Sequence, residues 1–132
     1  MRFKTAIGGI FGVLLVHAFA LVTHLYYFWE PFDIPMHFSG GLVMGLLGIA
    51  IYDYLHAEPA PNNHPHWYKY LFVISFAIMV AVFWEFHEYL LDQTIVVWMN
   101  WNQTQPSLGD TILDLLMGTI GATCAAVIFR NK

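Results

Sequence analysis

The chain alternates between long apolar stretches and short segments that carry polar and turn-forming residues. Residues 5–29 contain no Asp, Glu, Lys or Arg, and residues 34–52 repeat this pattern over 19 positions. Two later stretches are also apolar, with acidic residues near one end of each. Each stretch is long enough for a helix of about 20 residues that crosses a bilayer. The pattern predicts an all-α fold, a single transmembrane domain over residues 1–132 in which four helices form a bundle, with spans at residues 5–29, 34–54, 69–91 and 107–129.

The segments between the spans differ in character. Pro31 and Pro35 indicate a turn before the second span. Residues 55–67 hold three Pro and three His and read as a loop. Residues 93–106 are polar but contain Ile, Val and Trp side chains. We therefore expect this last link to lie along the membrane interface, where amphipathic aromatic side chains gather.

The N-terminus permits a second interpretation. Arg2 and Lys4, the apolar run after them and the small residues Ala18 and Ala20 resemble a cleavable signal peptide. The apolar run continues to Trp29, which is longer than the apolar region of such peptides. This length favours a spanning helix.

Composition narrows the class of protein. Hydrophobic residues make up 58% of the chain and charged residues 11%, against about 45–50% and about 25% in soluble domains. A small soluble protein needs more polar surface than this chain can supply. The composition excludes an ordinary soluble enzyme and a nucleic-acid binder with a basic patch. The single cysteine, Cys124, excludes a disulfide framework.

The basic residues all fall on one side of such a bundle. With four spans, the N-terminus, the loop after the second span and the C-terminus share a side. The positive-inside rule places the side with the basic residues in the cytoplasm. We therefore expect a multi-pass protein of a bacterial-type inner (plasma) membrane, with both termini inside. The basic residues are Arg2, Lys4, Lys69, Arg130 and Lys132.

Acidic residues and one histidine gather at the opposite, outer end of three predicted helices. Within each helix a spacing of three or four residues places these side chains on one face. The sequence therefore predicts an acidic pocket near the outer leaflet. Its members are Asp33 and His37 at the start of the second span, Glu85, Glu88 and Asp92 at the end of the third, and Asp110 and Asp114 at the start of the fourth.

The charge balance of this pocket favours a bound cation. Residues 70–129 contain no Lys or Arg, so the carboxylates there have no permanent side-chain cation on their own spans. Each would cost about 2.5–3.5 kcal/mol at the bilayer centre, so protonation or a bound cation must neutralise it. Imidazole with carboxylates is a ligand set of Zn, Mn and Fe sites, and His37 therefore favours a divalent metal. The predicted metal ligands are His37, Glu85, Glu88, Asp110 and Asp114, with Asp33 as a further ligand or a rim residue, and Glu88 or Asp92 as general base.

Other roles for these residues stay open. The acids can hydrogen-bond one another or lie among lipid headgroups, and Asp33 and Asp110 can cap helix N-termini. His24 lies at the correct end of the first span to join the pocket, whereas the pattern leaves His17 ambiguous. His87 is about 200° around the helix from Glu85, so we expect it to face lipid or a neighbouring helix.

Three short motifs share an order with a known family. They are Asp33-x-x-x-His37, Glu85-x-x-Glu88, and Gly109-Asp110 followed by Asp114 and Gly121-Ala122. In this order they resemble the YjdF-like family of bacterial inner-membrane proteins and, more distantly, VanZ-like membrane proteins. The match covers residues 33–122. The family has no established activity, so the resemblance implies that these positions cluster without naming a reaction.

Three classes of function remain. The first is a metal-dependent membrane hydrolase or transferase that acts on a lipid or lipid-linked substrate at the outer leaflet. The second is a non-catalytic accessory subunit of a larger membrane complex, in which the polar cluster binds a partner or a structural metal. The third is a cation or proton transporter, since acids within a membrane often mark ion pathways. The acids collect at one end of the helices, which counts against a continuous pathway.

Overall fold

The computed structural model describes residues 2–56, 65–101 and 103–129. Part of the orientation argument falls outside these ranges, since Arg130, Lys132 and the side chain of Arg2 are not described.

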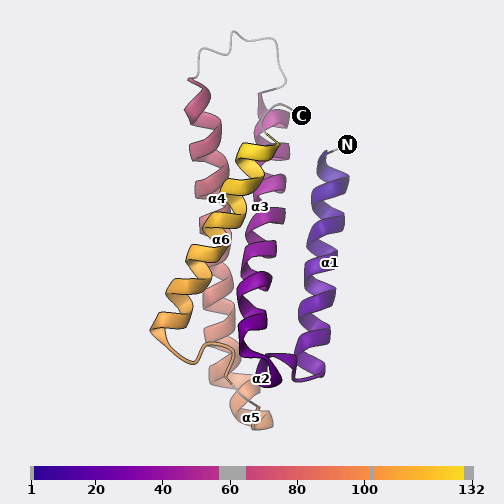
Figure 1. Ribbon diagram of the computed structural model, residues 1–132, viewed down its shortest axis with the longest axis vertical. Coiled ribbons are helices and arrows are strands. Elements are labelled where there is room, and N and C mark those ends of the chain that lie inside the picture. The colour runs from indigo at the N-terminus through magenta and orange to yellow at the C-terminus, as the bar shows by residue number, and fades with distance from the viewer. Residues whose placement is uncertain (1, 57–64, 102, 130–132) are drawn as a thin grey trace.

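Helices make up nearly all of the described chain, and no strand occurs in it. Four helical segments are long and apolar enough to cross a membrane, which confirms the predicted all-α membrane fold with four spans. In chain order the elements are α1 (Arg2–Val22), α2 (Leu25–Phe28), the 3₁₀ turn η1 (Glu30–Phe32), α3 (Asp33–Leu55), α4 (His66–Leu91), the π-helical turn η2 (Asp92–Val96), α5 (Val97–Met99) and α6 (Leu108–Ile128) (Figure 1).

The first span is shorter than predicted. The predicted helix over residues 5–29 ends in the structure at Val22. His24 adopts a left-handed backbone conformation with φ of 55°, which an α-helix does not accommodate. The Thr23 hydroxyl donates to the Phe19 carbonyl oxygen at 2.8 Å in the last turn. The chain then turns through α2 and η1, with Pro31 in the first turn of η1, and reaches the start of α3.

The third span is longer than predicted. Residues 93–99 are not a separate link, as the sequence predicts, but continue α4 through η2 and α5. The helix stops at Asn100, which has a left-handed φ of 52°. The apolar segment Trp67–Met99 has 33 residues, more than the roughly 17–25 that cross a hydrocarbon core. Its last turns therefore extend beyond the core, or the helix tilts.

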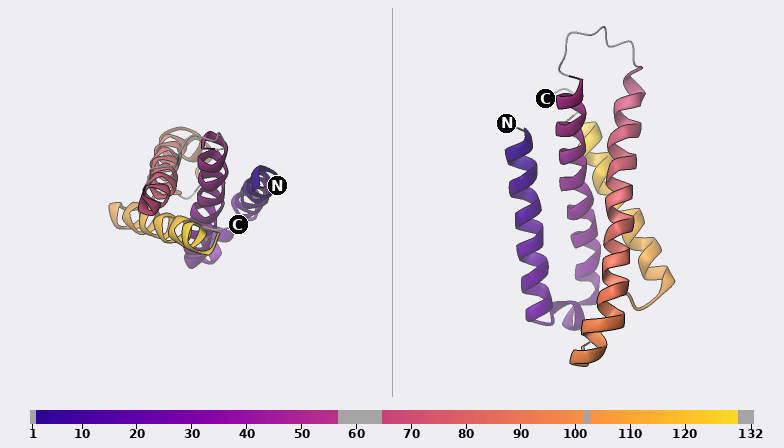
Figure 2. Two further views of the ribbon diagram at one scale, coloured as in Figure 1. Left: turned by 90° about the horizontal axis from the view of Figure 1, so that it is seen from above. Right: turned by 180° about the vertical axis from the view of Figure 1, so that it is seen from behind.

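α3 is the centre of the bundle and packs against α1, α4 and α6. α4 and α6 also pack against each other, whereas α1 lies on the outer side of α3 (Figure 2). The beginnings of α1 and α4 and the ends of α3 and α6 share one end of the bundle (Figure 1). We call this the termini end, and the opposite end, where α3 and α6 begin, the site end.

The two ends of the bundle have different interiors. Near the termini end a small apolar core forms around Ile49, Val73 and Ala126. At the site end the buried side chains include carboxylates from α4, η2 and α6. The fold therefore provides an ordinary packed core at one end and a polar interior at the other.

Glycines allow α3 and α6 to approach closely. A Cβ on Gly41 would overlap the backbone of Gly118, and a Cβ on Gly121 would overlap the carbonyl group of Phe38. Small residues let helix backbones in membranes pack at such short separations. This contact places the start of α6 against the start of α3, where Asp114 and His37 lie.

Asp92 holds the segment after α5 against the end of α4. Its Oδ1 accepts hydrogen bonds from Thr104 N at 2.8 Å and from Thr104 Oγ1 at 2.9 Å, and its Oδ2 accepts one from Gln105 N at 2.9 Å. The carboxylate is 2% exposed. Asp92 therefore fixes where the chain returns across the site end.

We predict that Gly41→Ala destabilises the bundle, because the added methyl group meets backbone that cannot move as a side chain can. The expected loss is about 1–3 kcal/mol in the free energy of unfolding, which is typical of overpacking. Thermal melting in a mild detergent measures it. Gly40→Ala is the matched control, since a Cβ there meets no heavy atom within 4 Å. Equal melting temperatures for the two variants would contradict the packing described.

We predict that Asp92→Asn loosens residues 103–106. The amide group places an NH₂ against one of the N–H donors, and a buried donor without a partner costs about 1–3 kcal/mol. Hydrogen exchange of the Thr104 and Gln105 amides should speed up markedly. Glu30→Gln, which alters an exposed carboxylate at the same end, serves as control. Unchanged protection in Asp92→Asn would show that these hydrogen bonds do not hold the segment.

Candidate metal centre

Side chains from three helices converge at the site end. Helical periodicity explains the arrangement, because residues three or four apart share a face and all three helices turn that face inward. Glu85 and Glu88 are 5% and 4% exposed, and Asp114 is 2% exposed. The predicted acidic pocket therefore lies inside the bundle and not on its lipid-facing surface.

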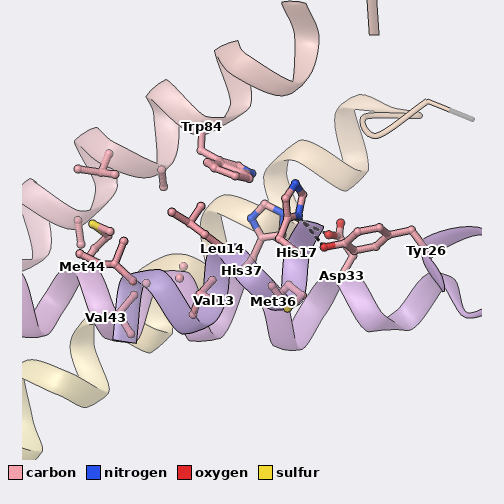
Figure 3. Close-up of a pocket in the computed structure, with 17 residues that line it drawn as sticks. Val13, Leu14, His17, Tyr26, Asp33, Met36, His37, Val43, Met44 and Trp84 are labelled. Atoms are coloured by element: carbon pink, nitrogen blue, oxygen red, sulfur yellow. Dashed lines mark hydrogen bonds and ion pairs between the residues drawn. The ribbon is translucent and has the colours of Figure 1, made fainter. Parts of the chain in front are cut away.

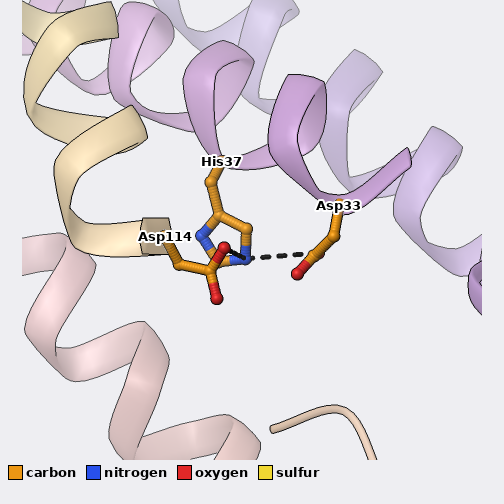
Figure 4. Close-up of side chains that lie close together, drawn as sticks. All are labelled: Asp33, His37 and Asp114. Atoms are coloured by element: carbon orange, nitrogen blue, oxygen red, sulfur yellow. Dashed lines mark ion pairs between the residues drawn. The ribbon is translucent and has the colours of Figure 1, made fainter. Parts of the chain in front are cut away.

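His37 occupies the middle of this group. Its Nε2 lies 3.4 Å from Asp33 Oδ1 and 3.7 Å from Asp114 Oδ1. Its Nδ1 lies 3.9 Å from Glu85 Oε1. The imidazole thus has α3 and α6 carboxylates at one nitrogen and an α4 carboxylate at the other. Figure 4 shows Asp33 and Asp114 on either side of the ring edge that carries Nε2.

Two sets of donor atoms are compact enough to share an ion. In each set one donor atom per residue lies within 4.8 Å of the others, and His37 belongs to both. The first set is Asp33, His37 and Asp114, and the second is His37, Glu85 and Glu88. Four of the predicted carboxylate ligands are therefore close to the His37 imidazole.

Glu85 has one satisfied and one unsatisfied oxygen. Oε2 accepts a hydrogen bond of 2.6 Å from Gln105 Nε2. Oε1 is buried and has no hydrogen-bond partner, although it points toward His37 Nδ1. A buried acceptor without a partner is costly and rare, so Oε1 marks a place where a donor or a cation fits.

The remaining predicted residues divide into two groups. Asp92 uses both carboxylate oxygens to bind Thr104 and Gln105, as described above, and belongs to neither ion-sized set. Asp110 lies one turn before Asp114 and also stays outside both sets. Its backbone N–H donates to Ser107 Oγ at 3.1 Å, and its Oδ2 is buried without a hydrogen-bond partner.

The other histidines considered for the pocket, His17, His24 and His87, lie outside both sets. His17 Nδ1 and Tyr26 Oη share a hydrogen bond of 2.8 Å. The ring of His24 contacts Trp101 edge-on, with centroids 5.9 Å apart. His87 is exposed at the bundle surface, as expected, with its ring near Trp84.

Sequence patterns alone did not identify Gln105 or Tyr26 as parts of this region. Neither residue lies three or four positions from a residue of the predicted pocket. Gln105 follows α5, and Tyr26 lies in α2. Both are polar residues in segments that lead directly into acidic helices. Only the turn of the chain at each of these places brings them to Glu85 and His17.

A polar cavity of about 370 Å³ opens beside the centre, and we call it the vestibule. Its lining combines carboxylates with aromatic and histidine side chains, and none of the described residues that line it is Lys or Arg. Burial raises the pKa of the Tyr26 hydroxyl, and the nearby charges of Asp33 and Glu88 raise it further. Tyr26 therefore stays neutral and keeps its proton for hydrogen bonding. The acidic lining residues are Glu30, Asp33, Glu88 and Asp110.

The comparisons with known proteins give one match. No curated protein and no solved structure matches the chain. Residues 3–131 match the family described as "Predicted membrane protein (DUF2238)". This match agrees with the four membrane-spanning helices and with the expectation of a membrane-protein family without an assigned activity. Since it extends over nearly the whole sequence, the chain belongs to the DUF2238 family of predicted membrane proteins.

Proposed function

We propose that the site end holds a divalent metal ion and that the protein is a metal-dependent membrane enzyme. The observation that carries the proposal is His37, an imidazole enclosed by carboxylates from three helices with donor atoms within 4.8 Å. This donor chemistry suits Zn, Mn or Fe. Glu85 Oε1 supports it independently, as a buried oxygen without a hydrogen bond that faces the same imidazole.

The charge of the site end supports a cation. Among the described residues, Lys69 forms an ion pair with Asp53 at 2.8 Å. This pair lies at the termini end, away from the acidic residues of the site end. At the site end Asp33, Glu85 and Asp114 have His37 as the basic group within ion-pair distance. One imidazole carries at most a single charge, so several buried carboxylates outnumber it. A divalent ion balances them where hydrogen bonds alone leave oxygens unsatisfied.

We place the ion on Nε2 of His37, with Asp33 and Asp114 as the other protein ligands. In metal sites the second ring nitrogen of a ligating histidine usually donates to a carboxylate, which orients the ring. Glu85 Oε1 is in position to accept from Nδ1 after a small shift, and Gln105 holds Glu85 from the other side. Three protein ligands leave coordination positions for water or substrate, as catalytic sites do.

Glu88 is then available as general base. It is buried, lies next to the ligand group and lines the vestibule through which a substrate can approach. In a hydrolysis, Glu88 would accept the proton of the attacking water and return it to the leaving oxygen. A bound cation would supply the charge that polarises a phosphoryl or carbonyl oxygen. Asp92 serves as an anchor for the chain, because both of its oxygens are already hydrogen-bonded.

The membrane setting directs the choice of substrate. The centre lies at the end of membrane-spanning helices, so a hydrolase or transferase there meets lipids or lipid-linked groups first. The one-sided distribution of basic residues supports the proposal that this end lies at the outer leaflet of a bacterial-type inner membrane, with both termini inside. The motif order around Asp33, Glu85 and Asp110 supports a narrower likeness to YjdF-like proteins, which stays a prediction.

Metal analysis tests the centre. Protein purified in mild detergent without added chelator should carry one divalent ion per chain, measured by elemental mass spectrometry. Asp114→Asn should lose it, since the substitution removes a charged ligand while keeping the size of the side chain. Asp53→Asn is the matched control, because it neutralises a carboxylate at the termini end and should retain the ion. An unmutated protein without stoichiometric metal, also after incubation with Zn, Mn or Fe, would refute the centre.

A second pair of variants tests which ring nitrogen binds the ion. We expect Asp33→Asn to lose the metal and Glu88→Gln to keep it, because Asp33 approaches Nε2 and Glu88 belongs to the set around Nδ1. Isothermal titration of each apo-protein with Zn²⁺ gives the affinities. The reverse order of affinities would move the ion to Nδ1 and would remove Glu88 as a free base.

A further inference from the structure

A second, apolar cavity of about 110 Å³ runs between α1, α3 and α4 and ends at His37. Figure 3 shows Leu14 and His17 of α1 facing Met36 and His37 of α3, with Trp84 of α4 across from them. The cavity lies within the membrane-spanning parts of these helices. A cavity with a mostly apolar lining holds an apolar occupant more readily than water, which needs polar partners.

Small residues and the position of α1 create this space. Gly40 lines the cavity, and a Cβ placed there meets no heavy atom within 4 Å. Ala77 and Ala81 line it from α4. α1 packs mainly against α3 and much less against α4. It is also the least buried of the four spanning helices. The space between α1 and α4 can therefore admit a chain from the surrounding lipid.

The apolar cavity and the vestibule meet. His17, Tyr26 and Asp33 line both, and the hydrogen bond between His17 and Tyr26 lies where they join. Together the two spaces have the polarity profile of a lipid molecule, with an apolar part inside the bundle and a polar part at its end.

The lining of the vestibule determines which headgroup charge it can bind. Four carboxylates line it without a described Lys or Arg, and an anionic headgroup alone would be repelled there. If Asp33 ligates the ion, three acidic side chains remain in the lining, those of Glu30, Glu88 and Asp110. Tyr27 and Trp101 add aromatic faces. Carboxylates with aromatic rings attract an ammonium group by charge and by cation–π contact.

We propose that the protein binds an amine-bearing zwitterionic phospholipid, with a segment of one acyl chain in the apolar cavity and the ammonium group in the vestibule. The lipid phosphate then lies near His37. That last contact rests on the proposed function, because the phosphate needs the bound cation to offset the surrounding carboxylates. The placement of the acyl chain and of the ammonium group depends only on the two cavities.

Photolabelling in vesicles tests the lipid. The full chain is reconstituted in mixed phosphatidylethanolamine and phosphatidylglycerol vesicles, in which one lipid at a time carries a diazirine in its acyl chain. Adducts are mapped by mass spectrometry and normalised to Phe11 and Leu15, which are exposed on α1 outside the cavity. The phosphatidylethanolamine probe should label Met36, Met44 and Trp84 several-fold more than the phosphatidylglycerol probe does. Equal normalised labelling by the two probes would overturn the proposal.

Filling the cavity gives the matched control. Gly40→Leu should reduce cavity labelling several-fold, because the side chain occupies the space. Gly12→Leu places the same side chain on α1 where a Cβ also meets nothing, outside the cavity lining, and should not change labelling. Labelling of Met36 and Trp84 that persists in a folded Gly40→Leu protein would contradict the chain position. If Gly40→Leu does not fold, the comparison of the two probes on the unmutated chain still decides.

Metal content separates this inference from the proposed function. Gly40 is not a ligand, so Gly40→Leu should lose lipid labelling and keep the ion. A protein without metal that still prefers the phosphatidylethanolamine probe would remove the metal centre and leave the lipid site. A protein that carries the metal but shows no preference between the two probes would remove the lipid site and leave the metal centre.

Discussion

The site end depends on one constraint, the neutralisation of carboxylates buried in a bundle that offers them little positive charge. Glu85, Glu88 and Asp114 are almost fully covered, and charged groups in such surroundings persist only when they are paired or neutralised. Gln105 satisfies one oxygen of Glu85, and His37 meets carboxylates at both ring nitrogens. These contacts leave Oε1 of Glu85 and Oδ2 of Asp110 without hydrogen bonds. The proposed ion at Nε2 of His37 would offset part of this excess of negative charge.

The close contact of α3 and α6 makes this geometry possible. Because Gly41 and Gly121 bring the two backbones together, Asp114 reaches the same imidazole nitrogen as Asp33. A larger residue at either glycine would separate the helices and lengthen both approaches to His37. The small-residue contact between α3 and α6 thus sets the size of the site at the end of the bundle. Stability and site geometry are coupled here through backbone packing and not through the polar residues themselves.

The sequence predicted those features that follow from helical periodicity and charge balance. Four apolar spans, the pairing of Asp33 with His37 on one face, and the burial of Glu85 beside Glu88 need only the helix repeat and the cost of a charge in lipid. It did not predict where the first and third spanning helices stop, because His24 and Asn100 end them through left-handed conformations that neither residue type requires. For the same reason the partners of Asp92 and Glu85 in residues 104–105 were missed. These hydrogen bonds depend on the path that the chain takes between α5 and α6, and no periodic pattern in the sequence predicts that path.

The peripheral position of α1 gives the lipid and metal proposals a common structural basis. A bundle in which α1 packed equally on α3 and α4 would cover Gly40 and close the apolar cavity. It would also bury His17 and Tyr26, whose hydrogen bond now lies where the apolar and polar cavities meet. The structure instead leaves one face of the centre covered by a single, weakly packed helix, while α4 and α6 fix the carboxylates from the other side. Rigid ligand positions and an accessible approach from the bilayer are opposing demands. In the proposed metal centre and lipid site, each demand would fall to different helices.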